Sequence, residues 1–198
     1  MSKLEANKKQ KRDSLLEAAF SLFTSKGIHK TSISDIVQQS GVAKGTFYLY
    51  FKDKYDIRNM LIAKKASQLF SKADEALMKT DITNIFDEVI FIIDHTINQL
   101  CTDKSLLLFI SKNLSWGIFK TTLINTSDDD LYLYNIYQRL IHRKDVSFRE
   151  PEIMVFMIIE LVSSTCYSAI LYEEPVNIEE LKPYLFDTVR NIMERHVI

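Results

Sequence analysis

Apolar residues recur along most of this chain at the three- and four-residue spacings of helices that bury one face. The first such pattern covers Arg12 to Lys26, and Gly27 is its end signal. No stretch alternates apolar and polar residues as a strand does. Only 4 glycines and 3 prolines in 198 residues leave little material for turns, which favours long helices. The pattern therefore predicts an all-α protein.

Residues 31–51 predict two short helices joined by a tight turn. Ser32 is a good N-cap residue, and Asp35 three positions later completes an approximate capping box. Gly41 can adopt the left-handed conformation that ends the first of these helices. Ala43, Phe47 and Phe51 recur at four-residue steps and are predicted to form the buried side of the second helix.

The opposite side of that second helix is polar and basic, with Lys44, Thr46, Tyr48 and Tyr50. All four side chains can bond phosphates or base edges, as in a helix-turn-helix whose second helix enters the major groove. An ordinary helical hairpin with a solvated outer face fits the same pattern, so these residues alone leave both interpretations open.

The remaining patterns divide the chain into two parts. Residues 1–52 are predicted to hold a polar N-terminal arm and a three-helix domain, and residues 53–198 a larger helical domain. A long linking helix over 53–78 joins them. The further helices are predicted over 82–100 (capped by Asp81), 104–114, 131–143, 151–172, and from the capping pattern at Asn177 and Glu180 to near the end.

Charge is distributed unevenly between these parts. Residues 1–65 carry 13 Lys/Arg and 6 Asp/Glu, a net charge of +7, whereas residues 66–198 carry 12 and 20, a net charge of −8. A basic first third on an acidic body suits nucleic-acid contact at one end only. The Lys-rich arm, residues 1–11, is either a solvated and partly disordered tail or a further phosphate contact.

Several classes of site find no support in the sequence. The histidines are scattered without metal-site spacing, and there is no phosphate-binding glycine loop, nucleophile elbow or CxxC pair, so we expect neither a metal, a cofactor nor an enzyme. The cysteines Cys101 and Cys166, with no export signal, suit reduced thiols of a cytoplasmic protein. The apolar run 153–172 is interrupted by Glu160, and we interpret it as a buried helix and not a membrane span.

Three stretches together resemble the DNA-binding domain of TetR-family transcriptional regulators over about residues 12–60. They are Phe20…Phe23…Gly27, Thr31-Ser32-Ile33-Ser34-Asp35-Ile36, and Gly41-Val42-Ala43-Lys44-Gly45-Thr46-Phe47-Tyr48-Leu49-Tyr50-Phe51-Lys52-Asp53-Lys54. The resemblance implies DNA contact by Thr31, Ser32, Lys44, Gly45, Thr46, Tyr48, Leu49, Tyr50 and Lys54. Lys44 and Thr46 are the candidates for base edges or adjacent phosphates, and Thr31, Tyr48 and Lys54 for phosphates. Leu49 stands where the family commonly has an aromatic or polar residue, and it can contact a thymine methyl group.

The C-terminal domain is expected to supply a ligand pocket and a dimer interface. The pocket candidates are aromatic or polar residues within apolar helices: His95, Asn98, Phe109, Asn113, Trp116, Tyr137, Phe156 and Glu160. The last two helices can bury their apolar surface within the subunit or against a second copy. The resemblance implies the second, a four-helix bundle across a two-fold axis, with Ile159, Ser163, Tyr167, Tyr184, Leu185, Thr188 and Ile192 as interface candidates.

Together these features predict a homodimeric transcriptional regulator, most simply a repressor. It would bind a palindromic double-stranded DNA operator and leave it when a small hydrophobic or amphipathic ligand occupies the C-terminal domain. Two other classes are carried as alternatives: an all-α module whose N-terminal helices bind a protein partner, and a helical enzyme.

Overall fold

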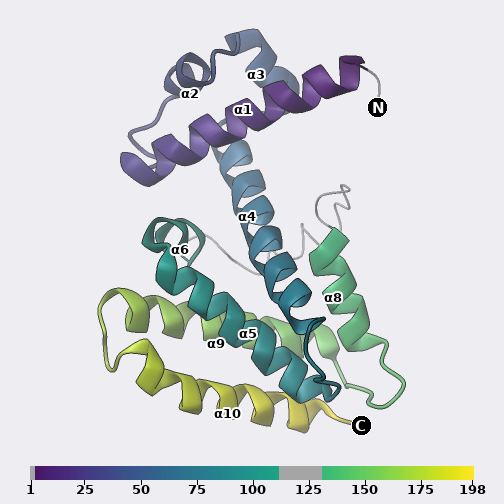
Figure 1. Ribbon diagram of the computed structural model, residues 1–198. Coiled ribbons are helices and arrows are strands. Elements are labelled where there is room, and N and C mark those ends of the chain that lie inside the picture. Colours follow the sequence, from purple (N-terminus) through teal and green to yellow (C-terminus); the bar gives the residue numbers. More distant parts are fainter. Residues whose placement is uncertain (1–2, 112–130) are drawn as a thin grey trace. The chain divides into compact units, whose positions relative to one another are not determined.

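The computed structural model describes residues 3–111 and 131–198, and the side chains of 3–110 and 136–198. Within these ranges the chain forms nine α-helices and no strand (Figure 1). An isolated antiparallel bridge pairs Phe148 with Val197 near the C-terminus. The predicted all-α class is confirmed.

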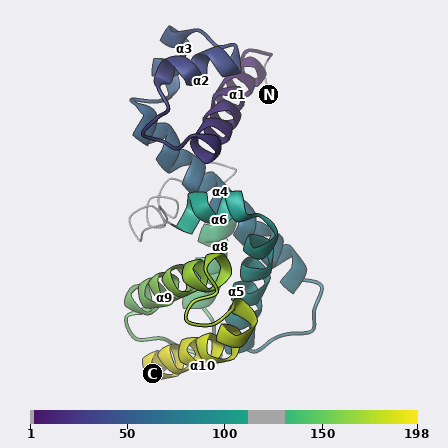
Figure 2. The same ribbon diagram turned by 90° about the vertical axis from the view of Figure 1, so that its left-hand side faces the viewer.

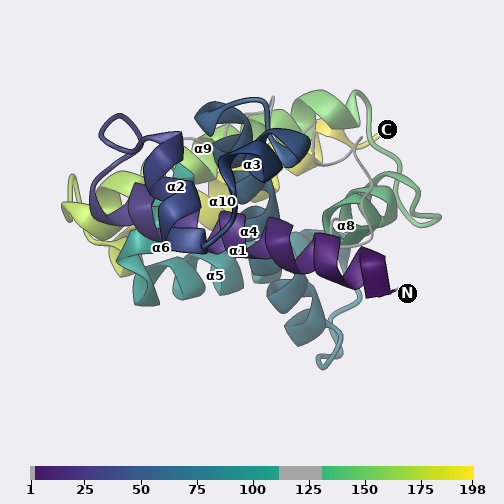
Figure 3. The same ribbon diagram turned by 90° about the horizontal axis from the view of Figure 1, so that it is seen from above.

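The chain divides into two compact units, residues 1–62 and 63–198. The first contains α1 (Lys3–Ser25), α2 (Ile33–Ser40), α3 (Lys44–Tyr50) and the beginning of α4 (Lys54–Leu77). Within it, α2 and α3 both pack on α1 and on each other (Figure 3). The unit boundary lies inside α4, so the first turns of the predicted linking helix pack with the N-terminal helices.

Two local expectations for the first unit are wrong. The residues predicted as a polar arm are helical from Lys3, because the long, straight side chains of this Lys-rich stretch are good helix formers. Ala43 is exposed, since it is the N-cap of α3 and precedes the helix. The core of the unit instead includes Leu16, Phe23 and Ile36.

The second unit contains the rest of α4 and five more described helices. They are α5 (Ile85–Thr102), α6 (Lys104–Ser111), α8 (Leu131–Ile141), α9 (Pro151–Leu171) and α10 (Ile178–His196). Helices α9 and α10 lie side by side, and α5 packs against both (Figure 2). Asn84 caps α5, where the sequence had suggested Asp81, because its side chain accepts the Phe86 and Asp87 backbone N–H groups.

Helix α9 is long and apolar enough to cross a membrane, by length and composition alone. In the structure its Met154 and Ile158 are buried in the core between α5, α9 and α10, and its Ala169 is buried as well. Opposite them, Leu185, Val189 and Met193 of α10 are buried in the same core. Their burial agrees with the prediction that this apolar run is a core helix.

Candidate nucleic-acid interface and ligand pocket

Helix α3 is anchored on one side and exposed on the other. Phe47 and Phe51 are fully buried, with their ring centroids 5.5 Å apart. Tyr48 and Leu49 on the outside are 53% and 80% exposed. Two large apolar side chains left in solvent on a seven-residue helix form a surface that a partner can contact.

Both ends of α2, the helix before α3, are fixed by local signals. The Ser32 hydroxyl accepts the Asp35 backbone N–H at 3.1 Å, and the Asp35 carboxylate accepts the Ser32 N–H at 2.8 Å, so the predicted capping box is confirmed. At the other end of α2, Gly41 has a φ of 67° and ends the helix in the left-handed conformation, as predicted. The capping box fixes where α2 begins, and the Gly41 turn sets the direction in which the chain continues from α2 to α3.

The Asp35 carboxylate also binds the Lys26 ammonium, with 2.9 Å between Oδ2 and Nζ. The Ser32 N–H and this ammonium together lower the pKa of Asp35 from 3.8 to about 2. The capping box therefore remains charged at neutral pH. The exposed ion pair between Lys26 and Asp35 connects the residue after α1 to the first turn of α2.

Most of the predicted DNA-contact residues lie on the surface. Ser32, Lys44, Gly45, Tyr48 and Leu49 are exposed, while Thr46 and Tyr50 are half-buried. Thr46 and Tyr50 lie on one flank of α3, and Lys44 and Tyr48 on the other. The predicted roles of these residues remain predictions.

Thr31 is placed differently from its prediction. Its exposed fraction is 1%, and its hydroxyl donates to the Gly27 carbonyl oxygen at 2.9 Å. Its backbone N–H donates to the Ile28 carbonyl oxygen. A side chain that is buried and hydrogen-bonded inside the unit cannot also reach a phosphate, so we remove Thr31 from the DNA-contact set and assign it to the loop before α2.

Lys54 also has an internal role that the sequence did not reveal. Its ammonium group donates to the carbonyl oxygens of Ile28, His29 and Thr31 at 2.9, 3.3 and 3.1 Å. An ammonium has three N–H donors, so these contacts account for all of them. Lys54 thus ties α4 to the loop before α2, a positioning role that the sequence did not indicate, and its predicted phosphate contact remains a prediction.

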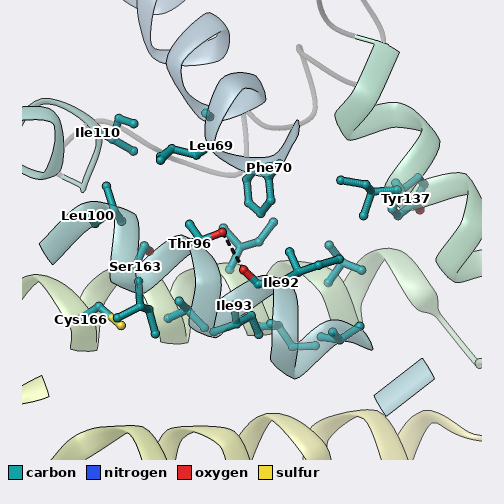
Figure 4. A pocket seen from close by; sticks show the side chains of 18 of the residues that line it. Leu69, Phe70, Ile92, Ile93, Thr96, Leu100, Ile110, Tyr137, Ser163 and Cys166 are labelled. Atoms are coloured by element: carbon teal, nitrogen blue, oxygen red, sulfur yellow. Dashed lines mark hydrogen bonds between the residues drawn. The ribbon is translucent and has the colours of Figure 1, made fainter. Parts of the chain in front are cut away.

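The second candidate site is an apolar cavity of about 160 Å³ within the C-terminal unit. Figure 4 shows Leu69 and Phe70 of α4, Ile92 and Thr96 of α5, and Ser163 and Cys166 of α9 around it. Helices α6 and α8 complete the described wall. The lining side chains are almost all hydrocarbon, and none of them carries a charge.

The few polar groups at the cavity are already engaged or weakly polar. The Thr96 hydroxyl donates to the Ile92 carbonyl oxygen at 2.7 Å (Figure 4). Burial raises the pKa of the Cys166 thiol to about 12, so it stays protonated. A cavity with this lining attracts apolar molecules and offers no counter-charge to a buried ion.

Among the predicted pocket residues, Tyr137 lines the cavity. His95 stacks on Phe91 and its Nδ1 contacts the Gln99 amide at 3.0 Å, while Asn98 accepts from the Lys182 ammonium at 2.7 Å. The remaining described candidates do not line it either, namely Phe109, Phe156 and Glu160. Asn113 and Trp116 lie outside the described residues. We therefore correct the pocket assignment: His95 contacts residues of its own helix, Asn98 contacts α10, and mainly aliphatic residues form the described wall.

One face of α9 lines the cavity, and the opposite face is exposed on the surface of the unit; we call the exposed face, with the neighbouring exposed residues of α10, the outer face. Ile159 and Ser163, predicted for the dimer interface, line the cavity instead, and Leu185 of α10 is buried in the subunit core. The outer face holds Ile153, Ser164 and, on α10, Tyr184, whose side chain is 75% exposed. Of the other interface candidates, Thr188 is exposed, and Tyr167 and Ile192 are half-buried.

Arg139 of α8 and Arg143, just after its end, hold α8 against the other helices that line the cavity. Arg139 pairs with Asp74 of α4, and its Nε lies 3.9 Å from Glu88 of α5. Arg143 binds the same Glu88 carboxylate at 2.6 Å and the Thr83 carbonyl oxygen at 2.7 Å. This set, the α8 ion-pair cluster, was not predicted, because charged residues 50 or more positions apart give no signal in a single sequence.

Comparison with known proteins agrees with the geometry of the first unit. The model for bacterial regulatory proteins of the tetR family matches residues 15–60, which include α2 and α3. The fatty acid metabolism regulator protein of Bacillus subtilis is 40% identical over 70 residues, 34% of this chain and 36% of that protein. With a second regulator of that organism, YvdT, the match covers 29% of the relative. The chain thus spans about a third of the length of these two relatives.

Solved structures resemble nearly the whole chain. A tetR-family regulator from Shewanella sp. PV-4 superposes with a TM-score of 0.66 at 16% identity, covering 95% of this chain and 98% of that one. FadR from Bacillus subtilis, solved in complex with stearoyl-CoA, gives a TM-score of 0.58 at 20% identity, covering 89% and 96%. At these identities the comparison establishes the fold.

Proposed function

Because this chain belongs to the TetR family of bacterial regulators, we propose that it is a sequence-specific DNA-binding transcriptional regulator that acts as a homodimer. The observation that carries the proposal is helix α3, buried through Phe47 and Phe51 and exposed through Tyr48 and Leu49. In a helix-turn-helix protein, the exposed face of the second helix enters the major groove. We place the protein in the cytoplasm, where its DNA is, and propose no catalytic role for it.

The charge of the first unit supports DNA as the partner. Residues 1–62 carry 11 Lys/Arg and 6 Asp/Glu, whereas the rest of the chain is acidic. Lys44 at the start of α3 and Lys52 just after it are both exposed. Phosphate neutralisation by such lysines supplies affinity, and contacts to base edges supply specificity.

The outer face of α9 and α10 supports a dimer. Ile153, Phe156 and Tyr184 are large apolar side chains that the subunit leaves between 40% and 75% exposed. A self-complementary contact through this face would form a two-fold dimer. Helix-turn-helix dimers bind half-sites about 34 Å apart, one turn of DNA, or a multiple of that distance. The operator is then a palindrome.

The cavity supports regulation by an apolar ligand, which we propose releases the protein from its operator. FadR of Bacillus subtilis binds stearoyl-CoA, and a hydrocarbon chain suits the uncharged lining found here. The volume of about 160 Å³ is close to that of the roughly 150 Å³ apolar cavity that accepts benzene. Without rearrangement of its walls, this cavity holds an apolar group of about six carbons.

Helix α4 is the element through which ligand and DNA binding would be coupled. Its Leu69 and Phe70 line the cavity, and its Asp74 binds Arg139 of α8. The same helix begins in the first unit, where Lys54 binds the loop before α2. An occupant that shifts α4 by differential contacts would change operator affinity about 5- to 150-fold, a coupling of about 1–3 kcal/mol.

The DNA-binding proposal is tested by selecting bound duplexes from a random library with the purified protein. We expect a palindromic site to be enriched, and Lys44→Ala to weaken its binding. Lys79→Ala removes an equal charge from an exposed position in the C-terminal unit and serves as the control. Equal losses from the two variants, or no enriched site, would contradict the assignment of α3.

Adjacent serines on α9 provide a matched pair for the ligand proposal. Ser163 lines the cavity and Ser164 is exposed on the outer face. With 1-hexanol and stearoyl-CoA as probes, at least one should raise the thermal midpoint and release wild-type protein from the selected duplex. Ser163→Leu should reduce both effects, and Ser164→Leu should retain them. If both variants retained the thermal shift and the release from DNA, the ligand would have to bind outside this cavity.

The dimer proposal is tested by sedimentation of variants at exposed apolar positions. Tyr184→Glu introduces a charge on the outer face, and we expect it to shift the protein towards monomer. Met78→Glu makes a comparable change at an exposed residue outside α9 and α10. Two unchanged dimers would rule out this part of the outer face as the interface.

A further inference from the structure

Leu49 lies on the outermost line of α3. At about 100° of rotation per residue, it is turned about 160–200° from the buried Phe47 and Phe51. Its exposed fraction of 80% agrees with this direction and exceeds that of every other large apolar side chain in the described part of the first unit. An isobutyl group held in solvent at this point of the helix contributes nothing to the core of its own unit.

Gly45 precedes Leu49 by one helical turn on the same line. A Cβ built on Gly45 would meet no atom within 4 Å, and its φ is not in the left-handed region. The unit itself therefore does not require glycine here, although glycine is less favourable than alanine within a helix. A bare backbone at an exposed position allows another molecule to approach closely.

Polar side chains flank this line on both sides. Lys44 and Tyr48 lie towards one flank of α3, and Thr46 and Tyr50 towards the other, with Tyr48 and Lys44 exposed. When a helix lies in the major groove, its outermost line meets the base edges, and its flanks face the two phosphate backbones. The central line of this helix has no hydrogen-bonding side chain.

We propose that Gly45 and Leu49 form the base-reading strip of α3 and select thymine by apolar contact with its 5-methyl group. The inference rests on the proposed DNA-binding function and specifies how that function achieves sequence selectivity. In the major groove, the thymine methyl is the apolar group among base edges that otherwise present donors and acceptors. Leu49 contacts the methyl, and Gly45 lets the helix backbone come close enough for that contact. Lys44 and Thr46, on the flanks of α3, would then contact the phosphates.

Deoxyuridine provides the test, because it differs from thymidine by this methyl group alone. Each thymidine of the selected site is replaced in turn, and affinity is measured by fluorescence anisotropy at fixed salt. We expect one position per half-site at which the replacement weakens wild-type binding about fourfold, the equivalent of one buried methyl group. Replacement at the other positions should have little effect.

Leu49→Ala identifies the side chain that reads the methyl. This variant should bind thymidine and deoxyuridine sites equally at the sensitive position. Leu4→Ala makes the same change at an exposed leucine of α1 and should keep the wild-type discrimination. If Leu49→Ala still discriminates, or if no position is sensitive in wild type, the inference is wrong while sequence-specific binding stands. If selection enriches no sequence, the proposed function fails as well.

Gly45→Ala separates the DNA role of this glycine from a structural one. The added methyl group meets open space in the unit and favours the helix, so the thermal midpoint should stay equal or rise. Affinity for the selected site should fall at least tenfold, because the methyl group keeps the helix from its closest approach. A destabilised variant, or one with wild-type affinity, would contradict the proposed close approach.

Discussion

Removing the Arg143 guanidinium should destabilise the C-terminal unit more than neutralising its partner Glu88. Arg143 Nη1 lies 2.6 Å from the Glu88 carboxylate, and the two side chains are only 16% and 11% exposed. Breaking such a pair by removing one partner costs about 3–5 kcal/mol in a fully buried setting. Arg139, with its Nε 3.9 Å from the same carboxylate, compensates in part. For Arg143→Met we therefore expect a loss of about 2–4 kcal/mol.

Glu88→Gln should preserve more of the surrounding hydrogen bonds than Arg143→Met does. Arg143 keeps Asp145 at 2.8 Å and the Thr83 carbonyl oxygen at 2.7 Å, and the new amide still offers an acceptor. We expect this variant to lose about 1–2 kcal/mol. In the double variant the carboxylate of Glu88 is gone together with the guanidinium that neutralised it, so its loss should be smaller than the sum of the two single losses.

Urea unfolding followed by circular dichroism at 222 nm measures all four proteins of this cycle. An Arg143→Met loss no larger than the Glu88→Gln loss, or two losses that add, would contradict the assigned coupling of the two side chains. A coupled result has a functional consequence, because α8 carries Tyr137 and Leu140 in the cavity wall. Loosening α8 should therefore also weaken the thermal shift produced by an apolar probe.

Three further predictions concern single residues. The depressed pKa of Asp35 means that its contribution to stability is present above about pH 4 and is lost as pH falls through about 2; Asp35→Asn should lack this loss when urea midpoints are compared between pH 4 and 2. Cys166, with a pKa raised to about 12 by burial, should react with a thiol reagent at pH 8 far more slowly than Cys101; equal rates would contradict its burial. Lys44→Ala should reduce the slope of log affinity against log salt by about 2 if it contacts one phosphate in each subunit of the dimer, and an unchanged slope would exclude that contact.

Features set by neighbouring residues could be predicted from the sequence. The capping box at Ser32 and the left-handed turn at Gly41 each depend on a few adjacent positions, and both are present. The burial of Phe47 and Phe51 follows from their four-residue spacing. Leu49 differs from the residue that the family pattern commonly has at its position. Because its side chain is largely exposed, this difference changes the binding surface and not the core.

Features that depend on distant contacts could not be predicted. Helix α9 is apolar almost all round, so its periodicity does not indicate which face is buried, and Ser163 was assigned to the interface although it lines the cavity. The internal hydrogen bonds of Thr31 and Lys54 gave no signal in the sequence, because their partners are backbone carbonyl oxygens in the loop before α2. The aliphatic cavity wall has no sequence signal distinct from that of an ordinary core.

The central claim is that the exposed face of α3 recognises a particular DNA sequence. The most direct measurement is the affinity of the purified protein for its selected duplex and for a scrambled duplex of equal length and composition, at one physiological salt concentration. We expect binding to the selected duplex to be at least about 10³-fold tighter, in the range typical of specific recognition. Equal affinities for the two duplexes would contradict it.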